Sequence, residues 1–244
     1  MKQIALPLYA PDDCSFSDIV SHPGIANPIQ MLLETFLSEL NESVPAFLHG
    51  PSGSGKTLIL KALQGFLTSE KVKHRSKSIF VPVTNNAHGS PTLESVVGMN
   101  HEQLTQYGAV LIDDVDKVSG IDSKHLWNIW NRLLTTGAHL VCSSSVGPDR
   151  IFSDDPHLRS RMISGLSVEL LPPDDAARIL ILDRMATKRG IRMTHDVISY
   201  LLSRKSRNLK RLEEILKILD RVSMEDRRRV TLRLVKQIEA EGII

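Results

Sequence analysis

The sequence predicts an α/β fold with a mostly parallel sheet, followed by a small helical domain. Five short apolar runs bounded by turn signals have the length of buried strands, at residues 44–48, 78–83, 109–112, 138–142 and 166–171. Helical patterns separate these runs, and such alternation is typical of a parallel sheet covered by helices on both faces. After Pro172 and Pro173 the strand signals stop and only amphipathic segments follow.

The chain is predicted to divide into an arm of residues 1–15, an α/β domain of residues 16–172 and a helical domain of residues 173–244. The arm has two prolines and an acidic pair without helical periodicity. The first helix is expected at 28–40, with Asn27 as its N-cap and Pro28 at its first helical position.

Four amphipathic segments make up the predicted helical domain, at residues 174–189, 194–204, 208–224 and 231–241. Asn208 and Thr231 have side chains suited to N-caps. Gly190 and Gly242 are suited to end the helices before them, because glycine adopts the left-handed conformation that follows a helix. These segments predict a bundle rather than a second sheet.

Composition narrows the class of protein. The chain has 30 Lys and Arg against 28 Asp and Glu, a net charge of +2 that is too even to indicate nucleic acid or membrane as a partner. Two cysteines, Cys14 and Cys142, do not make a disulfide framework, which favours a reducing cytoplasm. The start of the chain lacks the length and flanks of a signal peptide, and no apolar run approaches membrane-spanning length.

A phosphate-binding loop is the most specific motif in the sequence. Residues 50–57 match the full G-x-x-x-x-G-K-[ST] pattern between a predicted strand and a predicted helix. Backbone N–H groups of such a loop curl around phosphate oxygens, and the helix dipole favours negative charge at the same place. The cofactor, ATP or ADP, is therefore predicted to contact Gly50, Pro51, Ser52, Gly53, Ser54, Gly55, Lys56, Thr57 and Leu58. Lys56 is expected on the β- and γ-phosphates and the Thr57 hydroxyl on Mg²⁺.

Asp113 and Asp114 supply the expected second half of this site. They end the apolar run 109–112, and the carboxyl ends of parallel strands are where such folds bind ligands. Asp113 is predicted to be the magnesium partner, and Asp114 to orient or deprotonate the attacking water. By itself a strand that ends in Asp-Asp is usually a turn or a helix cap, and the pairing with the phosphate loop favours the functional interpretation.

Over nearly its whole length the chain resembles the DnaA initiator family of AAA+ proteins, and more closely the short regulatory relatives of the Hda type. The residues that carry the resemblance are Val110–Asp116, Trp127-Asn128-Ile129-Trp130-Asn131-Arg132-Leu133-Leu134 and Leu158-Arg159-Ser160-Arg161. The first two are similar to the family's Walker B strand and the helix behind it. The resemblance implies an AAA+ P-loop NTPase core with a parallel sheet, followed by a small α-helical lid domain.

Several site residues follow from the resemblance alone. Arg161 matches the family's arginine finger, which acts on the γ-phosphate of a neighbouring subunit, and without the match it would be a solvated surface charge. Ser145 aligns with the polar sensor, usually Asp in DnaA, so hydrolysis is expected to be slow. Lys210 stands where sensor 2 usually has arginine and keeps the charge without the planar fork. Ile19 and Val20 are implied to line the adenine.

The amino-terminal arm is similar to a clamp-binding peptide. Gln3, Leu6 and Leu8 match the Gln-x-x-Leu-x-Leu pattern by which replication proteins dock onto the sliding clamp, and Hda proteins carry such a peptide in this place. On pattern alone the arm would be a disordered tail.

The helix-turn-helix domain with which DnaA reads double-stranded DNA has no counterpart in the sequence. A contact with DNA through Arg227, Arg228, Arg229 and Arg233 is expected to be weak or indirect, since clusters of this kind are usually solvated.

Three functions stay open on the sequence. The first is a clamp-bound regulator that presents Arg161 to ATP held by DnaA, so that the chain is more an activator of DnaA than an enzyme. The alternative is a self-contained, weak ATPase that forms homo-oligomers as an initiator paralogue or helicase loader. The third is a clamp-tethered adaptor whose nucleotide only locks the lid to the core.

Overall fold

The computed structural model describes residues 14–37, 45–68, 77–83, 90–117, 120–151, 155–226 and 229–244. The chain divides into two compact units, one ending at Pro172 and the other running from Pro173 to Ile244. The predicted clamp peptide with Gln3, Leu6 and Leu8 lies outside the described residues, as do Arg227 and Arg228. None of the helices in the described ranges combines the length and the apolar character needed to cross a membrane.

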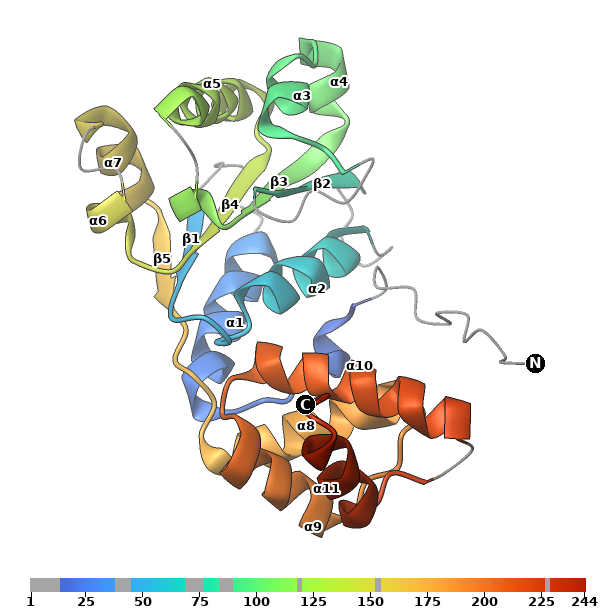
Figure 1. The fold of residues 1–244 in the computed structure, drawn as a ribbon. Coiled ribbons are helices and arrows are strands. Elements are labelled where there is room, and N and C mark those ends of the chain that lie inside the picture. Colours follow the sequence, from blue (N-terminus) through green and yellow to red (C-terminus); the bar gives the residue numbers. More distant parts are fainter. Residues whose placement is uncertain are drawn as a thin grey trace. The chain divides into compact units, whose positions relative to one another are not determined.

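Within the described residues of the first unit, five strands form one parallel sheet in the order β2-β3-β4-β1-β5 (Figure 1). The strands are β1 Ala46–His49, β2 Lys77–Pro82, β3 Tyr107–Asp113, β4 His139–Ser144 and β5 Leu166–Glu169. The predicted α/β fold with a parallel sheet is confirmed. Each predicted strand is found within a few residues of its expected bounds.

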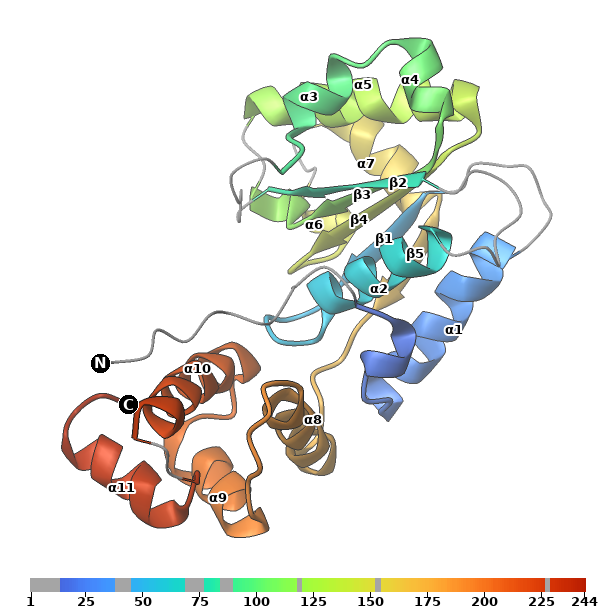
Figure 2. The same cartoon turned by 90° about the vertical axis from the view of Figure 1, so that its right-hand side faces the viewer.

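The sheet buries apolar side chains on both faces, which explains why its strands appear in the sequence as continuous apolar runs. In β3, Val110 and Ile112 belong to one buried cluster while Ala109 and Leu111 belong to the other. Helices cover both faces (Figure 2), with α3 Leu93–Val97, α4 His101–Thr105 and α5 Gly120–Thr136 on one face, and α1 Pro23–Leu37 and α2 Lys56–Thr68 on the other. Two hydrophobic cores therefore hold the sheet from either side.

The start of the first helix differs from the prediction. Helix α1 begins at Pro23, not at Pro28, and His22 takes the capping position by accepting the Gly24 N–H at its Nδ1 atom, 3.2 Å away. Pro28 lies inside the helix, where it removes the hydrogen bond that the Gly24 carbonyl would accept. That carbonyl instead accepts the Leu171 N–H at 3.1 Å, so a partner from outside the helix replaces the missing donor.

The segment between β2 and β3 forms two short helices that are attached to α5. Both begin with a side-chain cap, from Thr92 and from Asn100. The Arg132 guanidinium of α5 donates to the carbonyl of Val97, 2.6 Å away, and to that of Met99. Arg132 thus satisfies backbone acceptors that the end of α3 leaves without an intrahelical donor.

Helices build the described part of the second unit, α8 Asp175–Lys188, α9 His195–Tyr200, a π-helical turn Leu201–Lys205, α10 Leu209–Asp226 and α11 Leu232–Ala240. The predicted caps are confirmed, since the side chains of Asn208 and Thr231 accept N–H groups at the starts of α10 and α11. Gly190 and Gly242 have φ of 73° and 71°, the left-handed conformation expected after a helix. This unit is the helical domain predicted from the sequence.

Candidate phosphate-binding site

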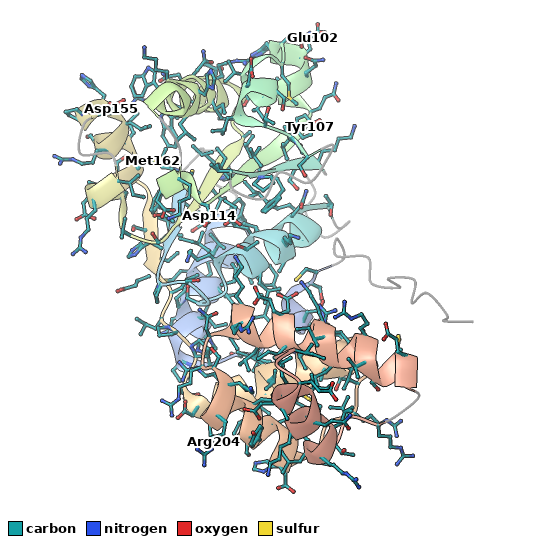
Figure 3. The ribbon with its side chains drawn as sticks, viewed as in Figure 1. Glu102, Tyr107, Asp114, Asp155, Met162 and Arg204 are labelled. Atoms are coloured by element: carbon teal, nitrogen blue, oxygen red, sulfur yellow. The ribbon has the colours of Figure 1, made fainter. Side chains whose placement is uncertain are left out.

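Three neighbouring strands bring the predicted site residues to one edge of the sheet. Strands β3, β4 and β1 are adjacent and parallel, so Asp113, the serines after Cys142 and Gly50 all lie at their carboxyl ends. The Gly50 N–H donates to the Ser144 carbonyl at 3.2 Å. Figure 3 labels Tyr107 and Asp114, which mark the two ends of β3, and Asp114 belongs to the edge that carries the site.

The phosphate loop depends on backbone conformations that favour glycine. Gly53 and Gly55 have φ of 83° and 97°, in the left-handed region. A Cβ atom at Gly50 would lie 2.2 Å from the carbonyl oxygen of Leu170, so no side chain fits there. The Ser54 hydroxyl is buried and lacks a hydrogen-bond partner among the described residues. Pro51, Ser52, Thr57 and Leu58 are exposed around the loop.

Lys56 is held inside the loop at the first position of α2. Its ammonium donates to the carbonyl oxygens of Gly50 and Pro51, at 2.7 and 3.0 Å. Burial lowers the pKa of Lys56, and the nearby carboxylates, Asp114 first and then Asp113, act in the opposite direction. An ammonium has three N–H donors, so these two carbonyls leave one N–H for a phosphate oxygen.

Asp113 is a buried carboxylate with both oxygens engaged. The Thr57 hydroxyl donates to Oδ2 at 2.7 Å, and the Ser143 hydroxyl donates to Oδ1. Burial raises the pKa of Asp113, while the hydrogen bonds from Ser143 and Thr57 act in the opposite direction. The two residues predicted to share Mg²⁺, Thr57 and Asp113, are therefore brought into direct contact.

Asp114 has a strained backbone beside the same site. Its φ of 61° is the one positive value among the described residues other than glycine, a conformation that is unfavourable for a residue with a Cβ atom. The Asp114 N–H donates to the Ser143 hydroxyl oxygen at 3.0 Å. Residues held in such conformations cluster at functional sites, so the backbone conformation of Asp114 marks this position as a candidate part of the site.

Ser145, the predicted sensor, contacts a different acidic residue. Its hydroxyl donates to Oδ2 of Asp116, which also accepts from the Lys117 ammonium at 3.0 Å. Burial alone would raise the pKa of Asp116, but the hydrogen bonds from Ser145 and Lys117 outweigh it and the pKa is lowered. Asp116 is therefore an ionised member of the cluster at this edge, a role that the sequence interpretation did not give it.

The predicted adenine segment lies against α2. A 3₁₀ turn, Phe16–Asp18, precedes Ile19 and Val20, which are both half-buried. The Phe16 ring packs edge-on against Phe66 of α2, with ring centroids 6.1 Å apart. The Cys14 thiol donates to the Leu58 carbonyl at 3.8 Å. This segment is thus fixed to the helix that begins in the phosphate loop.

Arg161, the predicted finger, lies on helix α7 (Pro156–Ile163), whose start and end are marked by the labels of Asp155 and Met162 in Figure 3. Its guanidinium carbon is 4.8 Å from the centre of the Trp127 ring of α5. The His157 ring approaches the same indole, with centroids 6.3 Å apart. No carboxylate pairs with Arg161 within the described ranges.

Lys210 belongs to the second unit and lies in the first turn of α10. Its side chain is exposed and its backbone N–H donates to the Asn208 side chain at 2.9 Å. The adjacent Arg211 forms an ion pair with Glu214 at 2.9 Å. Of the two basic residues, Lys210 is therefore the one without a carboxylate partner among the described residues.

No role was predicted from the sequence for Ser143 or for Trp127, although both contact predicted site residues. Ser143 contacts both Asp113 and Asp114, and Trp127 lies under Arg161. The signal for Ser143 was the run of three serines at the end of a buried strand, but choosing among them needed the register of β4 against β3. Trp127 had no local signal, because its partner is 34 positions away in the sequence.

Two protein-family models match this chain, one for each of its structural units. The model of the bacterial DnaA ATPase domain matches residues 23–169, more than half of the chain, and the model of the Hda lid domain matches residues 175–238. The chain belongs to the DnaA/Hda family of AAA+ proteins. The resemblance stated from the sequence is thereby confirmed for the family, for both of its structural parts.

Individual relatives of this DnaA/Hda-family chain span most of its length. A Haemophilus influenzae protein, described as uncharacterized, is 26% identical over 242 residues, 97% of this chain and 98% of that protein. Domain III of Thermotoga maritima DnaA superposes with a TM-score of 0.74 at 22% identity, covering 90% of this chain and 92% of that one. AMPPCP-bound DnaA from Aquifex aeolicus has a TM-score of 0.66 at 20% identity, covering 93% and 69%.

The chemistry of the groups at this edge fits a polyphosphate with a hard cation. The loop offers a buried Ser54 hydroxyl without a partner among the described residues, and the Lys56 ammonium has an N–H to spare. Asp113 and Thr57 supply oxygen atoms, which are the ligands that Mg²⁺ takes in proteins.

Proposed function

We propose that this chain binds ATP or ADP with Mg²⁺ at the carboxyl edge of its sheet. The loop from Gly50 to Leu58 holds the phosphates, Ile19 and Val20 line the adenine, and Lys210 of the lid supplies a further positive charge. Thr57 and Asp113 hold the cation, which neutralises phosphate charge when it is bound. The observation that carries this proposal is the contact of Thr57 with Asp113 beside a loop-bound Lys56.

We infer further that the chain regulates the initiation of DNA replication in the cytoplasm by acting on DnaA. Both of its units belong to families of replication proteins, DnaA and Hda. In this function the chain's own nucleotide is structural, and the reaction that matters is hydrolysis of ATP bound to DnaA. The chain is then an activator of another protein's ATPase.

Arg161 is the residue proposed to reach that ATP. It is a guanidinium without a carboxylate partner among the described residues, and it rests on the Trp127 ring rather than among the groups around Lys56. An arginine supplied in trans stabilises transition-state charge on the transferred phosphate and is worth about 10³–10⁵ in rate. An uncompensated arginine outside the chain's own site supports this role.

Docking on the sliding clamp completes the proposal. Gln3, Leu6 and Leu8 of the arm would enter a pocket of the clamp, with the two leucines burying apolar surface. Two such side chains contribute roughly 3–6 kcal/mol before ordering costs, enough for a weak tether. The support is the similarity of the arm to clamp-binding peptides.

A reconstituted assay tests the regulator. DnaA loaded with labelled ATP is mixed with this protein and with clamp on DNA, and phosphate release is followed. We expect stimulation by the wild type and by Arg159→Ala, whose exposed side chain lies on the same helix, and none by Arg161→Ala. Absence of stimulation by the wild type, or full stimulation by Arg161→Ala, would contradict the proposal. Replacing Leu6 and Leu8 with alanine tests the tether separately.

A self-contained ATPase is the second candidate, favoured by the assembly of Lys56, Thr57, Asp113 and Asp114 at one edge. In this function the chain forms its own oligomer as an initiator paralogue or a helicase loader, with Asp114 and Ser145 acting on the water. Steady-state turnover by the isolated protein, lost in Asp114→Ala, would favour it. If the isolated wild-type chain shows no turnover but stimulates hydrolysis of ATP bound to DnaA, the regulator is favoured.

A further inference from the structure

Ser143 connects Asp113, the last residue of β3, and Asp114, which follows it, to the neighbouring strand. Its side chain is fully buried at the end of β4, next to Cys142, which pairs in register with Ile112. The Ser143 hydroxyl donates its proton to Oδ1 of Asp113 and accepts the N–H of Asp114 at 3.0 Å. A single buried hydroxyl thus contacts both carboxylate residues of the site.

Both of these bonds act on groups that would otherwise be free to move. A carboxylate rotates readily about its last bond, but in Asp113 the Thr57 hydroxyl holds one oxygen at 2.7 Å while Ser143 holds the other. The bond to the Asp114 N–H supports a backbone conformation with φ of 61°, which a residue with a side chain adopts only with support from its surroundings.

The next two serines make different contacts. Ser144 is as buried as Ser143, but its hydroxyl closes a local turn, donating to the Val146 carbonyl at 2.7 Å and accepting the Val146 N–H at 3.0 Å. Ser145 is exposed and contacts Asp116. The three consecutive serine hydroxyls therefore have three different sets of partners, and only that of Ser143 contacts Asp113.

We infer that Ser143 is a positioning residue for the magnesium–nucleotide site: it orients Asp113 toward the cation and fixes the backbone of Asp114, without touching the nucleotide. The inference rests on the proposed nucleotide binding. Groups that orient ligands of a metal typically contribute about 10–100-fold to its affinity. Loss of the Ser143 hydroxyl should therefore weaken nucleotide binding in the presence of Mg²⁺ and change binding in its absence only slightly.

Isothermal titration of the full chain with ADP, once with Mg²⁺ and once with excess EDTA, tests this. The measured quantity is the dissociation constant in EDTA divided by the dissociation constant with Mg²⁺. In Ser143→Ala we expect this ratio to fall by about tenfold or more relative to wild type, with the affinity in EDTA changed by less than about threefold. In Ser144→Ala, which also removes a fully buried hydroxyl, the ratio should stay at the wild-type value. Ser143→Cys, a variant of similar size with a weak donor, should resemble Ser143→Ala and serves if the alanine variant does not fold.

The outcomes separate this inference from the proposed function. A wild-type ratio in both Ser143 variants, with Mg²⁺ still strengthening ADP binding, would overturn the positioning role and leave nucleotide binding intact. An equal loss in Ser144→Ala would also overturn it, because the effect would then belong to any buried hydroxyl of the strand. If the wild type binds ADP under neither condition, the nucleotide site itself fails, and the inference with it.

Discussion

The carboxyl edge of the sheet and helix α7 differ in how their charges are compensated. At the edge, the Lys56 ammonium and the Asp113 carboxylate each have two hydrogen-bond partners within the chain. On α7, Arg161 faces an aromatic ring and has no carboxylate partner among the described residues. The first arrangement joins the charged groups within one chain, and the second leaves a guanidinium on an aromatic ring without an acidic partner in the described ranges. The comparison suggests two separable tasks, nucleotide binding in cis and charge stabilisation in trans.

The largest effect is expected from Arg161→Ala, because it removes the charge that we propose to act in trans. Stimulation of DnaA-bound ATP hydrolysis should fall by about 10³-fold or more, while the dissociation constant of the chain's own nucleotide stays unchanged. Single-turnover hydrolysis and calorimetry measure the two quantities. If Arg161→Ala weakens the chain's own nucleotide binding, the separation between the two regions is wrong.

The converse change is Lys56→Ala, which acts on the cis site. A hydrogen bond to a charged group is worth about 1.5–3 kcal/mol, so nucleotide affinity should fall by about 10–100-fold. Lys61→Ala is the matched control, since Lys61 lies on the same helix but over the Phe80 ring, 5.9 Å from its centre. Calorimetry with ADP and Mg²⁺ checks both. Equal losses in the two variants would show that Lys56 has no special place in the loop.

A smaller effect on stimulation of DnaA is expected from replacing Trp127, the aromatic residue that contacts Arg161. Replacing Trp127 with leucine removes the ring on which Arg161 rests, and an exposed cation–π contact is worth about 0.5–1 kcal/mol. Stimulation of DnaA should drop by about 2–5-fold, with Trp127→Phe losing less because it keeps an aromatic face. A loss in Trp127→Leu as large as that in Arg161→Ala would mean that the ring itself contacts the partner.

The smallest effect concerns the stability of the nucleotide-free chain. Burial raises the pKa of Asp113 above its ordinary value of 3.8, so the fold favours the protonated carboxyl. The wild type therefore loses stability as the pH rises from about 3.8 through the folded-state pKa, and Asp113→Asn does not. At pH 7 the variant should therefore be more stable than the wild type. Urea unfolding between pH 4 and 7 measures this, and a variant less stable than the wild type at pH 7 would contradict it.

The sequence was informative where structure depends on neighbours along the chain. The glycine-dependent loop before α2, Asp113 at the end of β3 and the caps Asn208 and Thr231 all follow from local patterns, and the structure has these local features. The prediction placed the start of α1 at Pro28, because proline is common at the first position of a helix. It is tolerated inside this one because the Gly24 carbonyl accepts from Leu171, which is distant in sequence.

The part of the site that could not be predicted depends on contacts between distant segments. Three consecutive serines look alike in the sequence, and the pairing of β4 with β3 decides that Ser143 meets Asp113 while Ser145 meets Asp116. In the same way, no local pattern placed Trp127 of α5 under Arg161 of α7. The sequence thus named candidate groups, and tertiary contacts determine which of them lie together.

The most direct test of the central claim is to place the labelled ATP on one protein at a time. In one mixture DnaA carries γ-labelled ATP and this chain carries unlabelled ADP, and in the other this chain carries the label and DnaA carries unlabelled ATP. The account predicts that labelled phosphate is released rapidly in the first mixture and at the background rate in the second. Rapid release in the second mixture alone would show that the chain hydrolyses its own nucleotide, and would contradict a role of Arg161 in trans.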